Sequence, residues 1–312
     1  MKKDKVAVCL SGGVDSSVSA FLLKKDYSVT GVFGRFFSSI EAEERVKKIC
    51  EILEIPLLLL DLKEEFKSKV IDRSTEELKR GVTPNPCVFC NKEIKFGALF
   101  RTLSQFSFVA TGHYVMKKDN KLFIAKDEEK DQSYFLWMLN REQIKRALFP
   151  LGEYKKEEVR KIAKKLRLPV AEESQDLCFK EDALGNNPGS IVDKDGNLLG
   201  EHQGSFLYTI GQRKGLNLAG GPYYVLEKRG STVIVSRDEK DLYRREVELR
   251  DLNIDRELPL EVEAKIRYGS PREVALLEKN KLTFLTPQFA VCPGQPAVFY
   301  KNRELLGGGI IR

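Results

Sequence analysis

The sequence predicts an α/β protein: a parallel sheet covered by helices, then a small linking domain and a C-terminal β-barrel. Three observations predict this fold class. Short apolar strands alternate with amphipathic helices from the N-terminus onward. The stretch Gly185–Gly221 is rich in Gly, Asn and Asp, and from Tyr223 onward short strands with alternating polarity dominate. We therefore expect three domains, at residues 1–184, 185–246 and 247–312.

The first elements follow from the positions of the apolar residues. Lys5–Leu10 is an apolar run typical of a buried parallel strand. A Gly-rich turn follows it, and Asp15–Lys25 has apolar residues on one helical face. The same alternation then predicts a strand at Ser28–Phe33, a helix at Glu41–Leu53, a strand at Pro56–Leu60 and a helix at about Glu64–Arg80.

The segment Thr83–Asn91 is expected to be a loop, because two prolines interrupt it. Helices are expected after it at about Lys92–Ser104, near Arg141–Phe149 and at Lys155–Leu166, with a strand at Phe106–Thr111. The strand pattern of the later part is clearest at Val233–Ser236, Leu260–Ile266 and Ala297–Tyr300.

Composition limits the classes of protein. The 312 residues are 42% hydrophobic and 32% charged, which is ordinary for a folded globular chain. The longest apolar stretch, Ile55–Leu60, is far shorter than the roughly 20 residues of a membrane span. The apolar run Val6–Leu10 is too short for a secretory signal, so we expect a cytoplasmic protein with no membrane partner. The net charge of +7 permits a polyanionic partner such as nucleic acid.

Seven residues between the first expected strand and the first expected helix carry the strongest chemical signal. They are Ser11-Gly-Gly-Val-Asp-Ser-Ser17, called the Gly-rich heptad below. Small residues let the backbone close around phosphate oxygens, and the helix N-terminus adds N–H donors and a positive dipole end. Asp15 is expected to help hold a magnesium ion. A plain capped turn is the alternative, and a Walker P-loop is excluded because no Gly-Lys-Ser/Thr follows. The heptad resembles the pyrophosphate loop of the N-type ATP pyrophosphatases, which activate a carbonyl oxygen by adenylylation.

Six cysteines are too few for a disulfide scaffold. Cys87 and Cys90 form a Cys-x-x-Cys motif, and Cys178 follows Ser-Gln-Asp-Leu. A thiol on a loop near a helix start is easily deprotonated, as nucleophilic or redox chemistry requires. Half of a structural zinc site is the alternative for the pair, completed by Cys178 and His113 or His202. The other three are most simply small core residues: Cys9, Cys50 and Cys292.

Several further motifs, in order to the C-terminus, make the chain similar to the tRNA-specific 2-thiouridylases of this superfamily. They are Asn85-Pro-x-x-x-Cys-Asn-Lys-Glu-Ile-Lys-Phe96, Thr111-Gly-His-Tyr114, Lys130–Leu136, Ser174–Phe179, Tyr208–Leu216, Arg267-Tyr268, Cys292–Tyr300 and Leu306–Gly309. The resemblance implies an ATP pyrophosphatase domain ahead of the two later domains. It also implies an ATP-dependent sulfurtransferase that adenylylates and then thiolates C2 of the wobble uridine.

The resemblance assigns roles to individual residues. Cys178 would carry a persulfide, and Cys90 would close a disulfide with it as sulfur leaves. The residues implied to bind ATP are Ser11, Gly12, Gly13, Val14, Asp15, Ser16, Ser17, Gly34 and Gly112. Those implied to meet the target uracil are Asn85, Pro86 and Cys87. Those implied to touch the rest of the tRNA are His113, Lys130, Asp131, Gln132, Arg267, Tyr268 and Gln295. For His113 the alternative is a satisfied core histidine.

The implied cofactors are ATP and Mg²⁺, and the implied partners are tRNA and a sulfur-donor protein or persulfide carrier. Two features depart from the family pattern. Cys87 stands where the family commonly has Asp, and the segment Gly34–Ser39 lacks the usual Met-Lys-Asn-Trp-like stretch. Cys87, Cys90 and Cys178 also match the ligands of an iron–sulfur cluster in related tRNA-thiolating enzymes. A 4Fe–4S cluster on these cysteines and the persulfide route are both open.

Two other functions compete with this interpretation. A small-molecule adenylylating ligase, similar to GMP or NAD synthetase, would need neither the three cysteines nor the nucleic-acid motifs. A non-catalytic iron–sulfur or zinc protein that binds RNA would leave Ser11–Ser17 unexplained.

Overall fold

The computed structural model describes residues 3–36, 40–170 and 185–312. Cys178, the rest of Ser174–Phe179 and residues 37–39 lie outside the described part. Two compact units emerge from the chain. The first contains residues 1–70, 87–178 and 302–305, and the second contains residues 71–86, 179–301 and 306–312. Each is described by itself.

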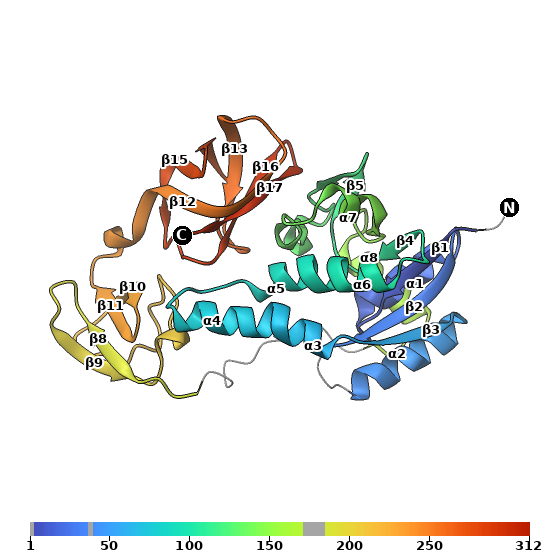
Figure 1. Cartoon of the computed structure of the whole chain (residues 1–312), viewed down its shortest axis with the longest axis horizontal. Coiled ribbons are helices and arrows are strands. Elements are labelled where there is room, and N and C mark those ends of the chain that lie inside the picture. Colours follow the sequence, from blue (N-terminus) through green and yellow to red (C-terminus); the bar gives the residue numbers. More distant parts are fainter. Residues whose placement is uncertain (1–2, 37–39, 171–184) are drawn as a thin grey trace. The chain divides into compact units, whose positions relative to one another are not determined.

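A parallel sheet of five strands forms the centre of the first unit, in the order β3-β2-β1-β4-β7. Figure 1 labels the first four of these strands. Val6 of the central strand pairs with Val29 on one side and Phe108 on the other. A central strand is covered on both faces, which explains its unbroken apolar run. The prediction of a parallel α/β sheet is confirmed. The strands are β1 (Lys5–Cys9), β2 (Ser28–Arg35), β3 (Leu57–Asp61), β4 (Phe108–Ala110) and β7 (Ala147–Leu148).

Helices pack on this sheet through one continuous apolar core. The helix α1 (Val14–Leu23) contacts both α2 (Ile40–Leu53) and α8 (Lys156–Lys165). Gly31 on β2 allows α2 to approach closely, because a Cβ there would lie 2.7 Å from Cys50 Sγ. The core of this unit includes Val6, Val8, Val18, Val46, Ile49 and Val159.

The expected loop at Thr83–Asn91 is wrong from Pro86 onward. A helix begins there as α5 (Pro86–Phe89) and continues through π-helical turns at Cys90–Ala98 into α6 (Leu99–Thr102). Proline is tolerated at a first helical position, because the N–H that it lacks has no partner there anyway. A second composite helix runs through α3 (Lys63–Phe66), π-helical turns at Lys67–Asp72 and α4 (Arg73–Lys79).

The helix expected at Arg141–Phe149 is shorter than its pattern indicates. The helix α7 (Arg141–Arg146) begins with a capping box, in which Asn140 and Gln143 exchange hydrogen bonds, and it ends before Ala147. Ala147 then pairs with Val109, so the chain enters β7 at the sheet edge. The unit also has a hairpin of β5 (Met116–Lys118) and β6 (Lys121–Phe123), and short 3₁₀ turns at Glu128–Lys130 and Ser133–Phe135.

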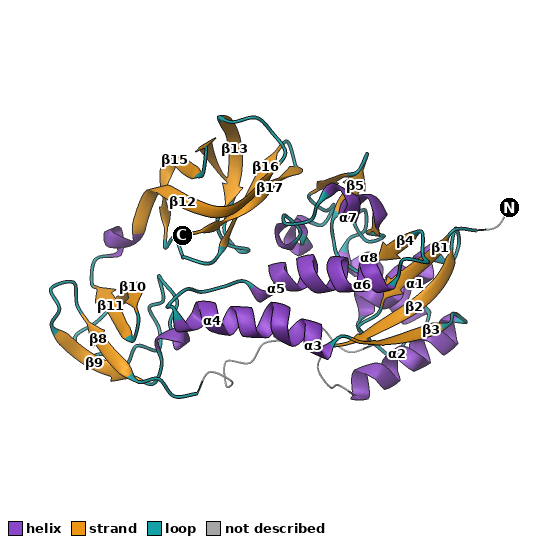
Figure 2. Ribbon diagram, in the orientation of Figure 1, coloured by secondary structure: helices purple, strands orange, loops and turns teal. Residues whose placement is uncertain are grey.

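Two antiparallel-rich sheets form most of the second unit, where the described stretch 185–312 has strands and short 3₁₀ turns (Figure 2). Four strands pair in the order β10-β11-β8-β9 around Ile191, Val225 and Val233. Six strands, in the order β12-β15-β14-β13-β16-β17, close into a barrel because β12 also pairs with β17. The expected C-terminal barrel is confirmed.

The strands expected at Val233–Ser236, Leu260–Ile266 and Ala297–Tyr300 are present, each within one residue of its expected bounds. Ten strands are described in residues 185–312. They are β8 (Gly189–Val192), β9 (Leu198–His202), β10 (Tyr224–Arg229), β11 (Thr232–Ser236), β12 (Tyr243–Ile254), β13 (Leu260–Lys265), β14 (Glu273–Glu278), β15 (Lys281–Phe289), β16 (Pro296–Lys301) and β17 (Glu304–Ile311). In the described ranges, no helix has the length and apolar character needed to cross a membrane.

Candidate active site

The strand order of the first unit indicates where a ligand binds. From β1 the chain moves outward through β2 and β3, whereas β4 lies on the other side of β1. Open parallel sheets bind ligands beyond the carboxyl ends of their strands, at the point where the order reverses. Ser11–Ser17 follows β1 and Thr111–His113 follows β4, so both segments lie at this point.

The Gly-rich loop is braced by its own hydroxyl groups. Gly12 has φ +79°, a left-handed conformation that favours glycine, and Gly13 is the N-cap of α1. The Ser16 hydroxyl accepts from the Ser11 backbone N–H at 3.1 Å, and the Ser17 hydroxyl donates to the Gly13 carbonyl at 2.8 Å. The first turn of α1 thus presents backbone N–H groups and the positive end of the helix dipole, as an anion site requires.

Gly112 packs directly on this first turn. A Cβ at Gly112 would lie 2.8 Å from the Ser16 backbone nitrogen and 2.9 Å from the Asp15 carbonyl carbon. The fold therefore brings two predicted ATP-binding segments together, although they are far apart in the sequence. Gly34 lies on β2 and pairs with Leu60, and a Cβ there would lie 2.7 Å from the Phe36 ring.

Asp15 faces a buried cation. Its two carboxylate oxygens accept from the Lys156 ammonium at 2.8 and 2.7 Å, and one also accepts from the Tyr114 hydroxyl at 2.9 Å. Lys156 is 7% exposed and Tyr114 is 2% exposed, whereas the Asp15 side chain is 32% exposed. The carboxylate that the sequence offered to magnesium thus already has an ammonium and a phenol as partners.

The Cys-x-x-Cys motif lies on the composite helix that begins with α5 at Pro86. Cys87 is exposed in its first turn, and Cys90 is 9% exposed. Protein atoms that displace water raise the pKa of the Cys87 thiol, and the Lys95 ammonium opposes this rise. Burial likewise raises the pKa of Cys9 to about 12, again opposed by Lys95. Lys95 therefore acts on both the end of β1 and the Cys-x-x-Cys motif.

The remaining cysteines match the simple expectation only in part. Cys50 and Cys292 are buried and Cys9 is half-buried. Desolvation raises the pKa of Cys50 to about 11. Among the described residues, no three His, Cys, Asp or Glu side chains are grouped to hold a metal ion. The proposed partner of Cys87 and Cys90, Cys178, is outside those residues.

His113 is buried in an aromatic environment. Its ring is 8% exposed, its Nδ1 lies 2.8 Å from the Thr111 hydroxyl, and Phe96 and Phe149 pack beside it. Burial holds the pKa of His113 well below its usual value, and the Lys95 ammonium adds to this effect. His113 is therefore neutral near pH 7, and its expected contact with tRNA stays a prediction.

The neighbouring polar segment is held to the same region. The Asp131 carboxylate accepts from the Ala125 backbone and the Ser133 hydroxyl, at 2.9 and 2.6 Å. The Gln132 side chain accepts from the Tyr114 backbone N–H at 3.0 Å. Lys130 is half-buried at the end of a 3₁₀ turn. The segment is thus ordered by specific bonds instead of being a loosely solvated charged loop.

In the second unit, two of the residues expected to touch tRNA are engaged with backbone carbonyls. Arg267 donates to the carbonyls of Ile210 and Ala290 at 2.7 and 2.8 Å, and Tyr268 beside it is exposed. Gln295 donates to the carbonyls of Thr83 and Pro84 at 2.9 and 3.2 Å.

The segment Thr83-Pro84 has further hydrogen bonds within the second unit. The Thr83 N–H donates to the Pro293 carbonyl at 3.0 Å, and the Lys228 ammonium donates to the Thr83 hydroxyl at 3.1 Å. These bonds fix the chain just before Asn85 and Pro86, which are half-buried and lead into the Cys-x-x-Cys motif.

Sequence reasoning missed three cations near the expected ATP site. Lys156 and Lys95 read as ordinary charges on helices, and only the tertiary structure brings them to Asp15 and to Cys9. Arg45 on α2 lies beside the loop, since its Nε is 3.4 Å from a Cβ built at Gly12. Within residues 3–36, 40–170 and 185–312, that buried Nε has no hydrogen-bond partner, which no sequence pattern indicates.

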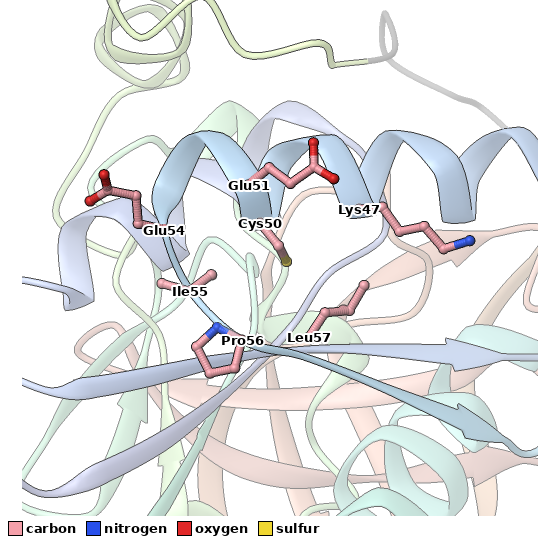
Figure 3. A pocket seen from close by; sticks show the side chains of 7 residues that line it. All are labelled: Lys47, Cys50, Glu51, Glu54, Ile55, Pro56 and Leu57. Carbon is pink, nitrogen blue, oxygen red and sulfur yellow. The ribbon is translucent and has the colours of Figure 1, made fainter.

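A surface hollow lies elsewhere in the first unit. It is lined by the C-terminal half of α2 and the start of β3, with the Cys50 side chain pointing from the helix toward the strand (Figure 3). This is the amino end of β3, so the hollow is at the opposite end of the strand from the ligand edge. None of the expected site residues lines it.

Family comparisons cover the chain in three consecutive parts. Residues 4–182 match a model described as a tRNA methyl transferase HUP domain, and residues 178–237 match its PRC-barrel domain. Residues 242–311 match an aminomethyltransferase β-barrel domain.

Curated relatives match the whole chain. The tRNA-specific 2-thiouridylase MnmA 2 of Clostridium botulinum (strain Langeland) is 40% identical over 349 aligned positions, covering 100% of this chain and 99% of the relative. The tRNA-specific 2-thiouridylase MnmA of Carboxydothermus hydrogenoformans is 41% identical over 356 positions, covering 99% and 98%. The chain belongs to the tRNA-specific 2-thiouridylase family. Among solved structures, one described as a predicted subunit of tRNA methyltransferase from Methanocaldococcus jannaschii is 20% identical and covers 51% of this chain and 75% of its own, with a TM-score of 0.35.

Membership of the 2-thiouridylase family agrees with the resemblance found in the motifs. It also weakens both competing functions, since the relatives match the linking domain and the barrel as well as the nucleotide-binding part.

Proposed function

We propose that the chain is an ATP-dependent tRNA 2-thiouridylase, which replaces O2 of the wobble uridine by sulfur. The observation that carries this proposal is family membership over the full length. The position of the Gly-rich loop, where the strand order of the sheet reverses, supports it. The loop supplies an ATP site without any Walker lysine. The proposed nucleotide contacts are Ser11–Ser17 and Gly112, with Gly34 as a further contact from β2.

The first proposed step is adenylylation of the base. O2 of the uracil attacks the α-phosphorus of ATP, the bond to the β-phosphate breaks, and pyrophosphate leaves. Gly12, Gly13 and the first turn of α1 would stabilise the charge on the departing phosphates through backbone N–H groups. ATP enters with Mg²⁺ as its counter-ion, and Mg²⁺ supplies charge neutralisation on the phosphates. Asp15 is a poor ligand for this ion, since its oxygens already have partners.

The second proposed step transfers sulfur. The terminal sulfur of a Cys178 persulfide attacks C2 of the base, and the bond from C2 to oxygen breaks as AMP leaves. The Cys90 thiolate then attacks the Cys178 sulfur, so the persulfide bond breaks and a Cys90–Cys178 disulfide forms. A thiol reductant and a sulfur-donor protein or persulfide carrier would regenerate the persulfide. Asn85, Pro86 and Cys87 would hold the target uracil.

An iron–sulfur cluster at Cys87, Cys90 and Cys178 is the alternative sulfur carrier. The described residues contribute at most two of its three ligands, and one is exposed whereas the other is buried. Anaerobic purification with iron and acid-labile sulfide measured, and Cys87→Asp alongside, separates the routes. Stoichiometric iron that is lost with activity in Cys87→Asp supports the cluster, whereas full thiolation by iron-free protein with disulfide accumulation supports the persulfide.

Exchange of labelled pyrophosphate into ATP tests the first step. Exchange that needs unmodified tRNA supports adenylylation of the RNA. Exchange that needs only a small carboxylate or nucleotide would favour the ligase interpretation, and transfer of a methyl group to tRNA would favour the activity in the family-model description.

A further inference from the structure

The Asp15–Lys156 pair carries an inference about how the loop accepts a polyanion, and it rests on the proposed ATP site. Lys156 is the first residue of α8, and its backbone N–H donates to the Asp127 carboxylate at 2.8 Å. This bond fixes the helix start from which the buried side chain reaches Asp15, 141 positions away in sequence. The ammonium also lies 5.7 Å from the centre of the Tyr114 ring.

The charges of Asp15 and Lys156 have opposite effects on a bound polyanion. A carboxylate in the first turn of α1 is favourable for the helix itself, because it faces the positive dipole end. The same carboxylate is unfavourable for a loop that must bind a triphosphate, because two negative charges close together in a partly buried site repel each other. The Lys156 ammonium contacts both oxygens and cancels this charge.

We propose that Lys156 is a positioning residue of the ATP site: it neutralises Asp15 and fixes its side chain, so that the loop can accept the phosphates. Asp15 then acts as a structural anchor of the loop and not as a magnesium ligand. The donor set supports this assignment. One Asp15 oxygen accepts from both Tyr114 and Lys156 and the other accepts from Lys156, so a divalent cation would have to displace an ammonium that is itself buried.

A cycle of variants in the full-length protein tests this proposal, with ATP affinity measured by calorimetry in the presence and absence of Mg²⁺. The variants are Lys156→Met, Asp15→Asn, the two combined, and Lys156→Arg. Thermal melting of each variant reports folding separately. Lys156→Met leaves a bare carboxylate at the loop and is expected to weaken ATP binding roughly 10- to 100-fold. Lys156→Arg keeps the charge and is expected to retain most of the affinity.

The decisive comparison is between the single and the double variant. Asp15→Asn in the Lys156→Met background removes the uncompensated charge and is expected to recover most of the lost affinity. Asp15→Asn alone leaves an extra cation at the loop, so ATP binding is expected to tighten and to keep its magnesium dependence. A double variant as weak as Lys156→Met would overturn the proposal, because Lys156 would then contact phosphate directly. Loss of magnesium dependence in Asp15→Asn would overturn it too, because Asp15 would be a ligand.

These results can be separated from failure of the proposed function. A folded wild-type protein that binds no ATP at all would contradict the ATP site itself. If the wild type binds ATP and Lys156→Met binds it with the same affinity, only the role of Lys156 is contradicted.

Discussion

Gly12 and Gly13 are adjacent in the loop but differ in what a side chain would meet. Gly12 has a positive φ and lies against α2, so any substitution there strains the backbone. Gly13 has φ −92°, and a Cβ there would meet only the Ser11 hydroxyl oxygen, at 3.5 Å. Gly13 therefore offers a substitution that the fold tolerates and the proposed phosphate site does not.

We expect Gly13→Val to abolish measurable ATP binding in a protein that still folds, because two methyl groups would fill the space above the first turn of α1. Gly13→Ala is the graded control and should bind with intermediate affinity. Calorimetry gives the affinities, and circular dichroism checks the fold. Unaltered ATP affinity in folded Gly13→Val would show that the phosphates bind elsewhere.

His113 makes a prediction about pH. Its pKa is held well below 6.5 in the folded protein, so the unfolded chain binds a proton that the folded chain does not. The contribution of His113 to the free energy of unfolding is therefore fully present above pH 6.5. It falls as the pH decreases below 6.5, by up to about 1.4 kcal/mol per pH unit. Denaturant unfolding of the wild type and His113→Gln checks this. The difference in stability between them should shrink at acid pH, and a constant difference would mean that His113 is accessible and titrates normally.

The position of the Gly-rich loop between strand and helix could be predicted from the sequence, but the side chains that contact the loop could not. The Gly-rich heptad is a contiguous pattern, so its place between strand and helix follows from local spacing. Lys156 contacts Asp15 across 141 positions, and the Arg45 Nε meets Gly12 only because α2 packs beside the loop. No local period encodes such contacts.

The segment before the Cys-x-x-Cys motif shows the same limit for whole elements. Two prolines indicated a loop, yet Pro86 occupies a first helical position and starts α5. Likewise β7 has two residues, too few to give a period, and its pairing with β4 decides its conformation. The helices α1, α2 and α8 were predicted to within about two residues, because their apolar periods span several turns. The long strands β12, β15 and β17 were not predicted individually, because only the general strand pattern of that part was recognised. Gln295 donates to the carbonyls of Thr83 and Pro84, which are 212 and 211 positions away in the sequence, and only the fold reveals these bonds.

We expect Gln295→Ala to slow thiolation more than it weakens tRNA binding, because it releases the segment that leads to Asn85 and Cys87. Loss of its two hydrogen bonds is expected to cost about 1–3 kcal/mol of local stability. Gln288→Ala is the matched control, since the Gln288 side-chain amide donates to Thr286 of its own strand. Single-turnover rates and tRNA affinities check the split. A fall in tRNA affinity with an unchanged rate would instead support a direct tRNA contact by Gln295.

For the whole molecule, the net charge of +7 and the match to full-length relatives predict tRNA binding that depends on salt. Each phosphate contact contributes about 0.7–0.9 to the slope of log affinity against log salt concentration. Arg267 donates to two backbone carbonyls, so we expect Arg267→Ala to lower the melting temperature and leave this slope nearly unchanged. Lys130→Ala should lower the slope by about 0.7–0.9 if Lys130 meets a phosphate. Filter binding over a salt series checks both, and a wild-type affinity insensitive to salt would contradict the prediction.

The proposed activity puts sulfur on a tRNA uridine at the expense of ATP. The direct measurement is mass spectrometry of nucleosides from unmodified tRNA after incubation with the protein, ATP, Mg²⁺ and a persulfide donor, with AMP counted in the same reaction. We expect 2-thiouridine at the wobble position, one AMP for each sulfur, and neither product with Gly13→Val or without ATP. AMP formation without 2-thiouridine, or a methylated nucleoside in its place, would contradict it.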